Sequence, residues 1–126
     1  MSENGPQMTP MGIERFVDVD GIRTRYFDEG DGPPILFLHG GNFGSPGGAS
    51  TARIWEPVFL SLSSQFNTIS MDRLGQGYTD NPKRDEDYTM DAVVQHVAAF
   101  VRKLGKGPCH LVGHSRGGYI VARLAL

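Results

Sequence analysis

A serine flanked by glycines is the residue of this chain best suited to covalent chemistry. Ser115 lies at the centre of a G-x-S-x-G pattern over residues 113–117. A short apolar segment precedes the pattern and an amphipathic segment follows it, which is the strand–turn–helix context of a nucleophile elbow. The flanking glycines remove Cβ atoms that would collide in so sharp a turn. The pattern therefore predicts that Ser115 is a nucleophile raised above the edge of a sheet.

Two backbone N–H groups are predicted to stabilise negative charge on a reacting oxygen. The N–H of Arg116 would lie at the N-terminus of the helix after the serine, where an anion is favoured. The second donor would come from the loop after the apolar run at 35–38, and Gly41 is the predicted donor, with Asn42 as the second choice. The residues predicted to line the site are His39, Gly40, Asn42 and His114.

Histidines near the pattern are predicted to have other roles than that of general base. His39 would brace the glycine-rich loop, because a base must approach Ser115 from above and not from the neighbouring strand. Strand alternation predicts that His114 points away from Ser115. Asp72, at the end of a neighbouring strand, is predicted to brace a loop.

Two other interpretations of the serine pattern compete with the nucleophile. In an ordinary strand–helix turn, Ser115 would serve only as a helix N-cap. In a dinucleotide-binding loop over residues 113–118, glycine would be needed where Ser115 stands. The chain also contains no G-x-x-x-x-G-K-[ST] pattern, so phosphate binding is disfavoured.

The elements needed to position these residues alternate between strands and helices. The apolar run at 35–38 is typical of a strand buried on both faces of a parallel sheet. Asp20-Gly21 predicts a hairpin turn, and Arg25, alternating with Thr24, is expected on a half-exposed strand. The predicted strands are 14–19, 22–28, 35–38, 66–72 and 110–112, and the predicted helices are 51–63, 90–104 and 117–126, with residues 73–88 as a loop and Thr89 as a cap. This order predicts an α/β fold, with a mostly parallel sheet, antiparallel first strands and helices on both faces.

Length and composition limit the possible functions. The 126 residues suit one domain, predicted over 13–126, with a flexible tail over 1–12. A net charge of −2 without basic blocks argues against a nucleic-acid partner, and no run is apolar enough for a membrane partner. The single cysteine, Cys109, excludes an internal disulfide and fits a cytoplasmic location. No metal and no cofactor is predicted.

Three motifs in order resemble the α/β-hydrolase superfamily. An apolar strand ends in His39-Gly40-Gly41, residues 72–79 are similar to the family's D-x-x-G-x-G-x-S loop, and the serine pattern follows at 113–118. The motif-bearing part covers residues 35–126. Residues 45–49, followed by Trp55, are also similar to the carbon–carbon bond (meta-cleavage product) hydrolases. The residues on either side of the serine differ, because those enzymes usually do not carry histidine and arginine where this chain has His114 and Arg116.

The resemblance implies a fold and a reaction. It identifies the chain as the N-terminal half of an α/β-hydrolase fold, with Ser115 as nucleophile and the N–H groups of Gly41 and Arg116 as oxyanion hole. The haloalkane dehalogenase and epoxide hydrolase branches of the superfamily use an aspartate as nucleophile, whereas this chain has a serine at that position. The implied partner is a small-molecule carbonyl substrate, which the sequence leaves open among an ester, a lactone and a vinylogous diketone.

The resemblance also places part of the machinery outside this chain. The family's acid and histidine follow the serine, so they are expected beyond Leu126, and the 126-residue chain alone is expected to be nearly inactive. One edge of the strand at 110–112 would then be unpaired. The alternative is a catalytically inert half-fold that acts as a binding or dimerisation module, in which a homo-oligomer would cover that edge.

Overall fold

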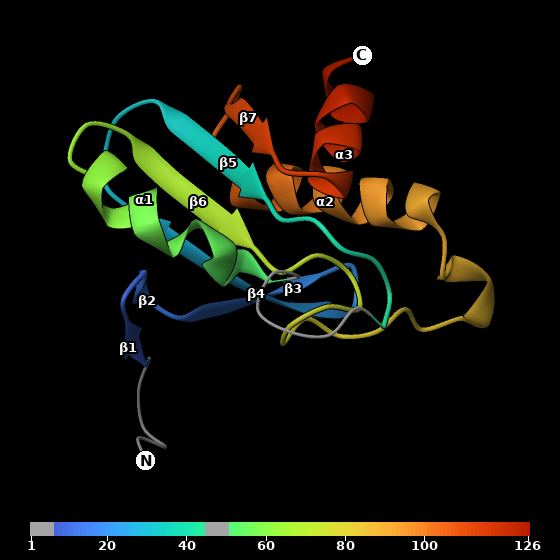
Figure 1. The fold of residues 1–126 in the computed structure, drawn as a ribbon. Coiled ribbons are helices and arrows are strands. Elements are labelled where there is room, and N and C mark those ends of the chain that lie inside the picture. Colours follow the sequence, from blue (N-terminus) through green and yellow to red (C-terminus); the bar gives the residue numbers. More distant parts are fainter. Residues whose placement is uncertain (1–6, 45–50) are drawn as a thin grey trace.

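A five-stranded mixed sheet forms the centre of the protein (Figure 1). The computed structural model describes residues 7–44 and 51–126. The sheet has the order β3-β4-β6-β5-β7. β3 pairs with β4 and β4 with β6 in antiparallel fashion, whereas β6, β5 and β7 are parallel. The strands are β3 (Arg15–Val19), β4 (Ile22–Glu29), β5 (Pro34–Leu38), β6 (Asn67–Met71) and β7 (His110–Gly113). The predicted α/β class with antiparallel first strands is confirmed.

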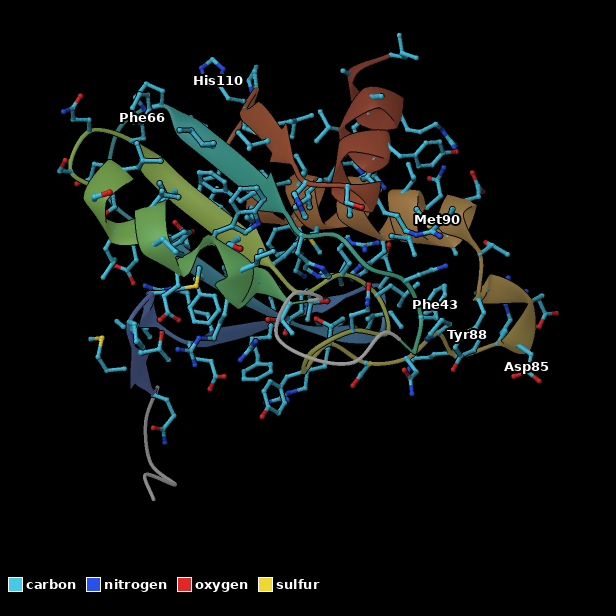
Figure 2. All side chains as sticks on the ribbon, viewed as in Figure 1. Phe43, Phe66, Asp85, Tyr88, Met90 and His110 are labelled. Carbon is cyan, nitrogen blue, oxygen red and sulfur yellow. The ribbon has the colours of Figure 1, made fainter. Side chains whose placement is uncertain are left out.

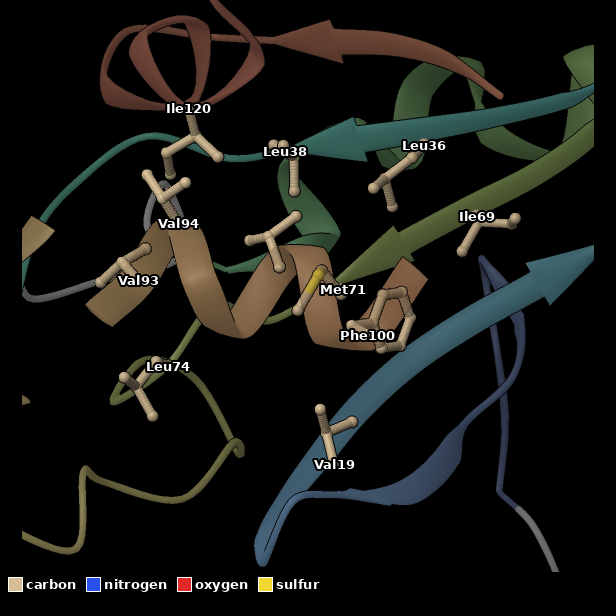
Figure 3. Packing of buried hydrophobic residues seen from close by; sticks show 11 residues of the cluster. Val19, Leu36, Leu38, Ile69, Met71, Leu74, Val93, Val94, Phe100 and Ile120 are labelled. Atoms are coloured by element: carbon tan, nitrogen blue, oxygen red, sulfur yellow. The ribbon is translucent and has the colours of Figure 1, made fainter. Parts of the chain in front are cut away.

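Helices cover both faces of this sheet. α1 (Glu56–Leu62) lies on one face, and α2 (Met90–Leu104) and α3 (Arg116–Ala125) lie on the other (Figure 1). Successive side chains of β5 serve the two faces in turn, because strand residues alternate in direction. Ile35 and Phe37 join the cluster under α1. Leu36 and Leu38 join the cluster under α2 and α3 (Figure 3). The prediction that residues 35–38 form a strand buried on both faces is confirmed.

Helix α2 has the bounds that the sequence predicted. The Thr89 hydroxyl accepts a hydrogen bond from the N–H of Ala92 at 3.1 Å, and this bond satisfies one free donor of the first turn. Gly105 ends the helix with φ 65°, in the left-handed conformation that favours glycine.

The helix predicted over 51–63 is divided in two. Residues Ala52–Trp55 form a 3-10 turn, η2, and α1 starts only at Glu56. Pro57 explains the division, because proline lacks an N–H and is accommodated only in the first turn of an α-helix. A second 3-10 turn, η3 (Asp85–Asp87), lies in the predicted loop at 73–88.

Part of the predicted N-terminal tail is ordered. β1 (Met8–Thr9) and β2 (Gly12–Ile13) form a short antiparallel hairpin. Met11 is fully buried in the cluster under α1, and this apolar contact holds the hairpin against the sheet. Residues 1–6 of the predicted tail lie outside the described residues. Within residues 7–44 and 51–126, every helix is too short or too polar to cross a membrane.

Candidate active site

The turn from β7 into α3 holds Ser115 in a strained conformation. Its backbone has φ 57° and ψ −120°, a region that residues with a side chain rarely occupy. Ser115 stands at the N-cap position of α3, but its side chain makes no capping hydrogen bond. If Ser115 were only a helix N-cap, no contact would compensate for its backbone strain. A nucleophile elbow, by contrast, requires a strained backbone at the serine.

Two glycines make this sharp turn possible. A Cβ atom on Gly113 would overlap the carbonyl oxygen of Gly117, and one on Gly117 would overlap the carbonyl oxygen of Leu38 in β5. Gly118, the next residue of α3, does not contribute to this close approach, because a Cβ atom on it would meet only the Gly113 oxygen, at an ordinary 3.8 Å.

The loop after β5 lies directly against the serine. A Cβ atom built on Gly40 would be 3.0 Å from the Ser115 Cβ and 3.1 Å from the His114 carbonyl oxygen. The His114 Nδ1 would be 3.4 Å from the same point, so the ring of His114 lies beside this loop. The structure thus brings together two segments that the sequence separates by more than seventy positions.

The two predicted donors are both unpaired within the described part of the chain. The N–H groups of Gly117 and Gly118 donate to the carbonyl oxygens of His114 and Ser115, each at 2.8 Å, but the N–H of Arg116 has no protein acceptor. The N–H of Gly41 likewise donates to no described residue. Gly41 has φ 86°, which a residue with a side chain would adopt only with strain.

His39 has the contacts of a bracing residue. It is fully buried, its Nδ1 lies 2.7 Å from the Gly40 carbonyl oxygen, and its Nε2 accepts the N–H of Arg73 at 3.0 Å. The Nδ1 must therefore carry the proton. Burial, followed by the nearby charge of Arg73, lowers the pKa of His39 to about 4. With both ring nitrogens occupied and the ring neutral, His39 has no free nitrogen to accept a proton.

Asp72 also braces a loop, as the sequence predicted. Its carboxylate accepts from Arg25 Nε at 2.7 Å, from the Ala52 N–H at 2.7 Å and from the Tyr78 N–H at 2.9 Å. Arg25 was expected on a half-exposed strand, and that expectation is wrong. Its side chain is only 5% exposed and pairs with the buried carboxylate of Asp72.

Arg73 is a site residue that sequence reasoning missed. Its side chain is fully buried beside the loop after β5 and donates hydrogen bonds to three successive carbonyl groups of that loop, those of residues 39, 40 and 41. Only its place after Asp72 in the motif at 72–79 hinted at a role.

The outer part of the same loop is held by the segment after β6. The Gln76 side chain donates to the Asn42 carbonyl oxygen at 2.8 Å. The rings of Phe43 and Tyr88 lie 4.9 Å apart between centroids (Figure 2). Asn42, predicted to line the site, is therefore part of a loop fixed at both ends.

The remaining histidines lie elsewhere. His96 in α2 is buried against Thr24, with 3.0 Å between its Nε2 and the threonine hydroxyl, and burial lowers its pKa to about 4. His110 begins β7, at the end of the strand opposite Ser115 (Figure 2). Among the residues that the structure describes, no histidine forms a hydrogen bond with Ser115, and no three His, Cys, Asp or Glu side chains are grouped to hold a metal ion.

Comparison with known proteins agrees with this architecture. The family model of the α/β hydrolase fold matches residues 33–126. The 2-hydroxy-6-oxo-6-(2'-aminophenyl)hexa-2,4-dienoic acid hydrolase of Metapseudomonas resinovorans is 36% identical over 84% of this chain and 35% of its own length. The 2-hydroxymuconate semialdehyde hydrolase of Pseudomonas sp. strain CF600 is 36% identical over 98% of this chain and 41% of its own length.

A solved structure shows the same likeness in three dimensions. The crystal structure of an epoxide hydrolase from Vigna radiata superposes with a TM-score of 0.72 at 31% sequence identity, over 85% of this chain and 33% of that one. The chain thus spans between a third and two fifths of the length of these proteins. The predicted similarity of residues 45–49 to carbon–carbon bond hydrolases lies outside the described residues.

Proposed function

The chain belongs to the α/β-hydrolase-fold family, and from this premise we propose that the protein is a serine hydrolase that cleaves a carbonyl substrate through an acyl-enzyme on Ser115. The observation that carries the proposal is the strained, uncapped conformation of Ser115 directly against a glycine loop. A backbone strain of this kind costs about 1–3 kcal/mol and persists where function requires it.

The reaction would take place in two steps. The Ser115 oxygen attacks the carbonyl carbon, its proton passes to a base, and the carbonyl oxygen becomes an oxyanion that accepts hydrogen bonds from the N–H groups of Gly41 and Arg116. Collapse of this intermediate breaks the bond to the leaving group, which takes up the proton. Water then attacks the acyl carbon and releases the acid, which regenerates the Ser115 hydroxyl.

The base is proposed to lie in a segment outside these 126 residues. Both nitrogens of His39 are occupied, and His96 and His110 lie away from Ser115. Within the described residues, His114 forms no hydrogen bond with Ser115. In the family the acid and the histidine follow the serine in chain order. This chain alone would therefore retain only the nucleophile and the oxyanion donors, and we expect it to be nearly inactive.

The substrate class is proposed from the relatives and from the nucleophile. Two relatives at 36% identity are named as hydrolases of a dienoic acid and of a muconate semialdehyde, which supports an open-chain conjugated ketone or aldehyde as substrate. An ester or a lactone would use the same steps. The likeness to an epoxide hydrolase carries less weight, because the resemblance to the superfamily implies an aspartate nucleophile in that branch, where this chain has Ser115.

Active-site labelling tests the proposal. The polypeptide encoded by the complete reading frame is treated with a fluorophosphonate probe, and turnover is measured with p-nitrophenyl esters and with a 2-hydroxy-6-oxo-dienoate. We expect one adduct on the peptide that contains residues 113–118, and loss of both labelling and turnover in Ser115→Ala.

The matched control is Ser64→Ala, because Ser64 is an exposed serine whose hydroxyl bonds only to the Ser61 carbonyl oxygen. This variant should label as the wild type does. If the folded wild type is neither labelled nor active, the hydrolase proposal is wrong. The alternative of a binding or dimerisation module would then gain support from a partner interaction that Ser115→Ala leaves unchanged.

A further inference from the structure

Arg73 is a buried cation that has no acidic partner among residues 7–44 and 51–126. Its side chain is fully buried. Its Nε donates to the His39 carbonyl oxygen at 3.0 Å, and its Nη2 donates to those of Gly40 at 3.0 Å and Gly41 at 2.6 Å. Its Nη1 is buried without a hydrogen-bond partner in the described structure. In the part of the chain that the structure describes, the hydrogen bonds of this side chain therefore all go to the loop that faces Ser115.

We propose that Arg73 is a positioning residue for the reaction at Ser115, which fixes the direction of the Gly41 N–H by holding the carbonyl groups of the loop. The inference rests on the proposed function. It adds a residue that the serine motif and the oxyanion donors do not include.

Peptide geometry supplies the link between the guanidinium and the N–H. The carbonyl of Gly40 and the N–H of Gly41 belong to one planar peptide unit, in which they point in opposite directions because the bond is trans. Arg73 and His39 both bind the Gly40 oxygen. The Gly41 N–H is therefore held on the side away from them, where it remains free of protein acceptors in the described residues.

The charge of Arg73 would act in the same direction as its geometry. The nearest carboxylate in sequence, Asp72, is already paired with Arg25 at 2.7 Å, so it does not neutralise Arg73. Burial, with the nearby charge of Arg116, lowers the pKa of Arg73 to about 10, and the group is still protonated at pH 7. A buried positive charge behind the loop favours negative charge developing in front of it.

An arginine side chain is better suited than a lysine side chain to hold several carbonyl groups of the loop. The guanidinium has five N–H donors in fixed directions, so it can bind several carbonyl groups at once, whereas a lysine ammonium is a compact charge on a flexible stem. Arg73→Lys should therefore keep the charge and lose part of the geometry. Arg73→Met should lose both.

The experiment compares fluorophosphonate labelling and ester turnover in variants of the polypeptide encoded by the complete reading frame. Rates are expressed per folded molecule, with the folded fraction measured by circular dichroism. For Arg73→Met we expect the maximal labelling rate and kcat to fall by about 10²-fold, the typical cost of an oxyanion donor, with KM little changed. Arg73→Lys should fold, and its labelling rate and kcat should lie between those of Arg73→Met and those of the wild type.

The matched control is Asn67→Leu, because Asn67 is another buried polar residue that donates to successive backbone carbonyl groups, those of Glu29 and Gly30, but it begins β6 and so lies at the other end of that strand from Arg73. It should lower the melting temperature without lowering the rate per folded molecule. The inference is overturned if Arg73→Lys reacts at the wild-type rate, or if Asn67→Leu loses as much kcat as the Arg73 variants. An unreactive wild type would instead overturn the proposed function itself.

Discussion

At the scale of single residues, Ser115 combines a polar side chain with a backbone conformation that suits glycine. With φ 57° and ψ −120°, it stores conformational strain of about 1–3 kcal/mol. Its side chain makes no hydrogen bond to the N-terminus of α3 that would offset this strain. The residue therefore represents a local cost in stability at the position proposed for the chemistry.

This strain predicts that removing the side chain stabilises the protein while it removes activity. In Ser115→Gly the strain is relieved, and the greater freedom of glycine in the unfolded chain offsets about 0.4–1 kcal/mol of the gain. We expect a net stabilisation of about 1 kcal/mol relative to Ser115→Ala, which keeps a Cβ atom. Urea denaturation of the two inactive variants measures the difference. Equal stabilities would mean that the turn is not strained.

Residue types and local spacing were sufficient to predict the sharp turn at Ser115, the need for glycines beside it and the loop at 39–42. They were not sufficient to find Arg73 or the burial of Arg25, because the partners of both residues lie in segments that are distant in the sequence. Arg25 pairs with a carboxylate 47 positions away, and Arg73 binds carbonyl groups 32 to 34 positions away. No periodicity within one segment records such pairings.

At the scale of elements, the contact between α3 and β5 depends on one glycine. A Cβ atom on Gly117 would overlap the Leu38 carbonyl oxygen of β5, which is backbone and cannot rotate away. A Cβ atom on Gly118, the next residue of the same helix, would meet nothing closer than 3.8 Å. The two adjacent glycines thus have opposite tolerance for a side chain.

The pair gives a direct test of this packing. Gly117→Ala should destabilise the protein by about 1–3 kcal/mol, as overpacking does, and should lower the reactivity of Ser115 by shifting the turn. Gly118→Ala should be neutral or stabilising by up to about 1 kcal/mol, because alanine is the better helix former. Urea denaturation of both variants provides the measurement. A wild-type stability for Gly117→Ala would contradict the described contact.

The elements themselves were predictable where their signals are local. Helix α2 carries its cap, its apolar spacing and its terminal glycine within its own sequence, and its predicted bounds are those observed. The hairpin of β1 and β2 was missed because the burial of Met11 against the sheet depends on tertiary contacts. The predicted helix at 51–63 was too long because the effect of Pro57 on the preceding turn was underestimated.

At the scale of the whole molecule, β7 forms one edge of the described sheet. Val112 on this strand is 38% exposed, and an exposed apolar edge is a site of association. We therefore expect residues 1–126, produced alone, to self-associate and to hydrolyse esters at no more than a trace rate. Analytical ultracentrifugation would measure the association.

A charged edge provides the control for this prediction. Val112→Lys should reduce self-association, since a lysine on an edge strand opposes pairing with another chain. A monomeric 126-residue chain with a cooperative unfolding transition would contradict the expectation. In that case the described sheet would be stable without a further strand beside β7.

The order of strands in the sheet has a consequence for the time course of folding. β5 lies between β6 and β7, although both are synthesised after it, and Ile35 pairs with His110 across most of the chain. Pairings so distant in sequence form slowly, because a long loop must close before any contact is gained. The hairpin of β3 and β4 can form early, but the loop at 39–42 meets Ser115 only when β7 docks. During refolding, the reactivity of the serine should therefore recover later than the compaction of the chain.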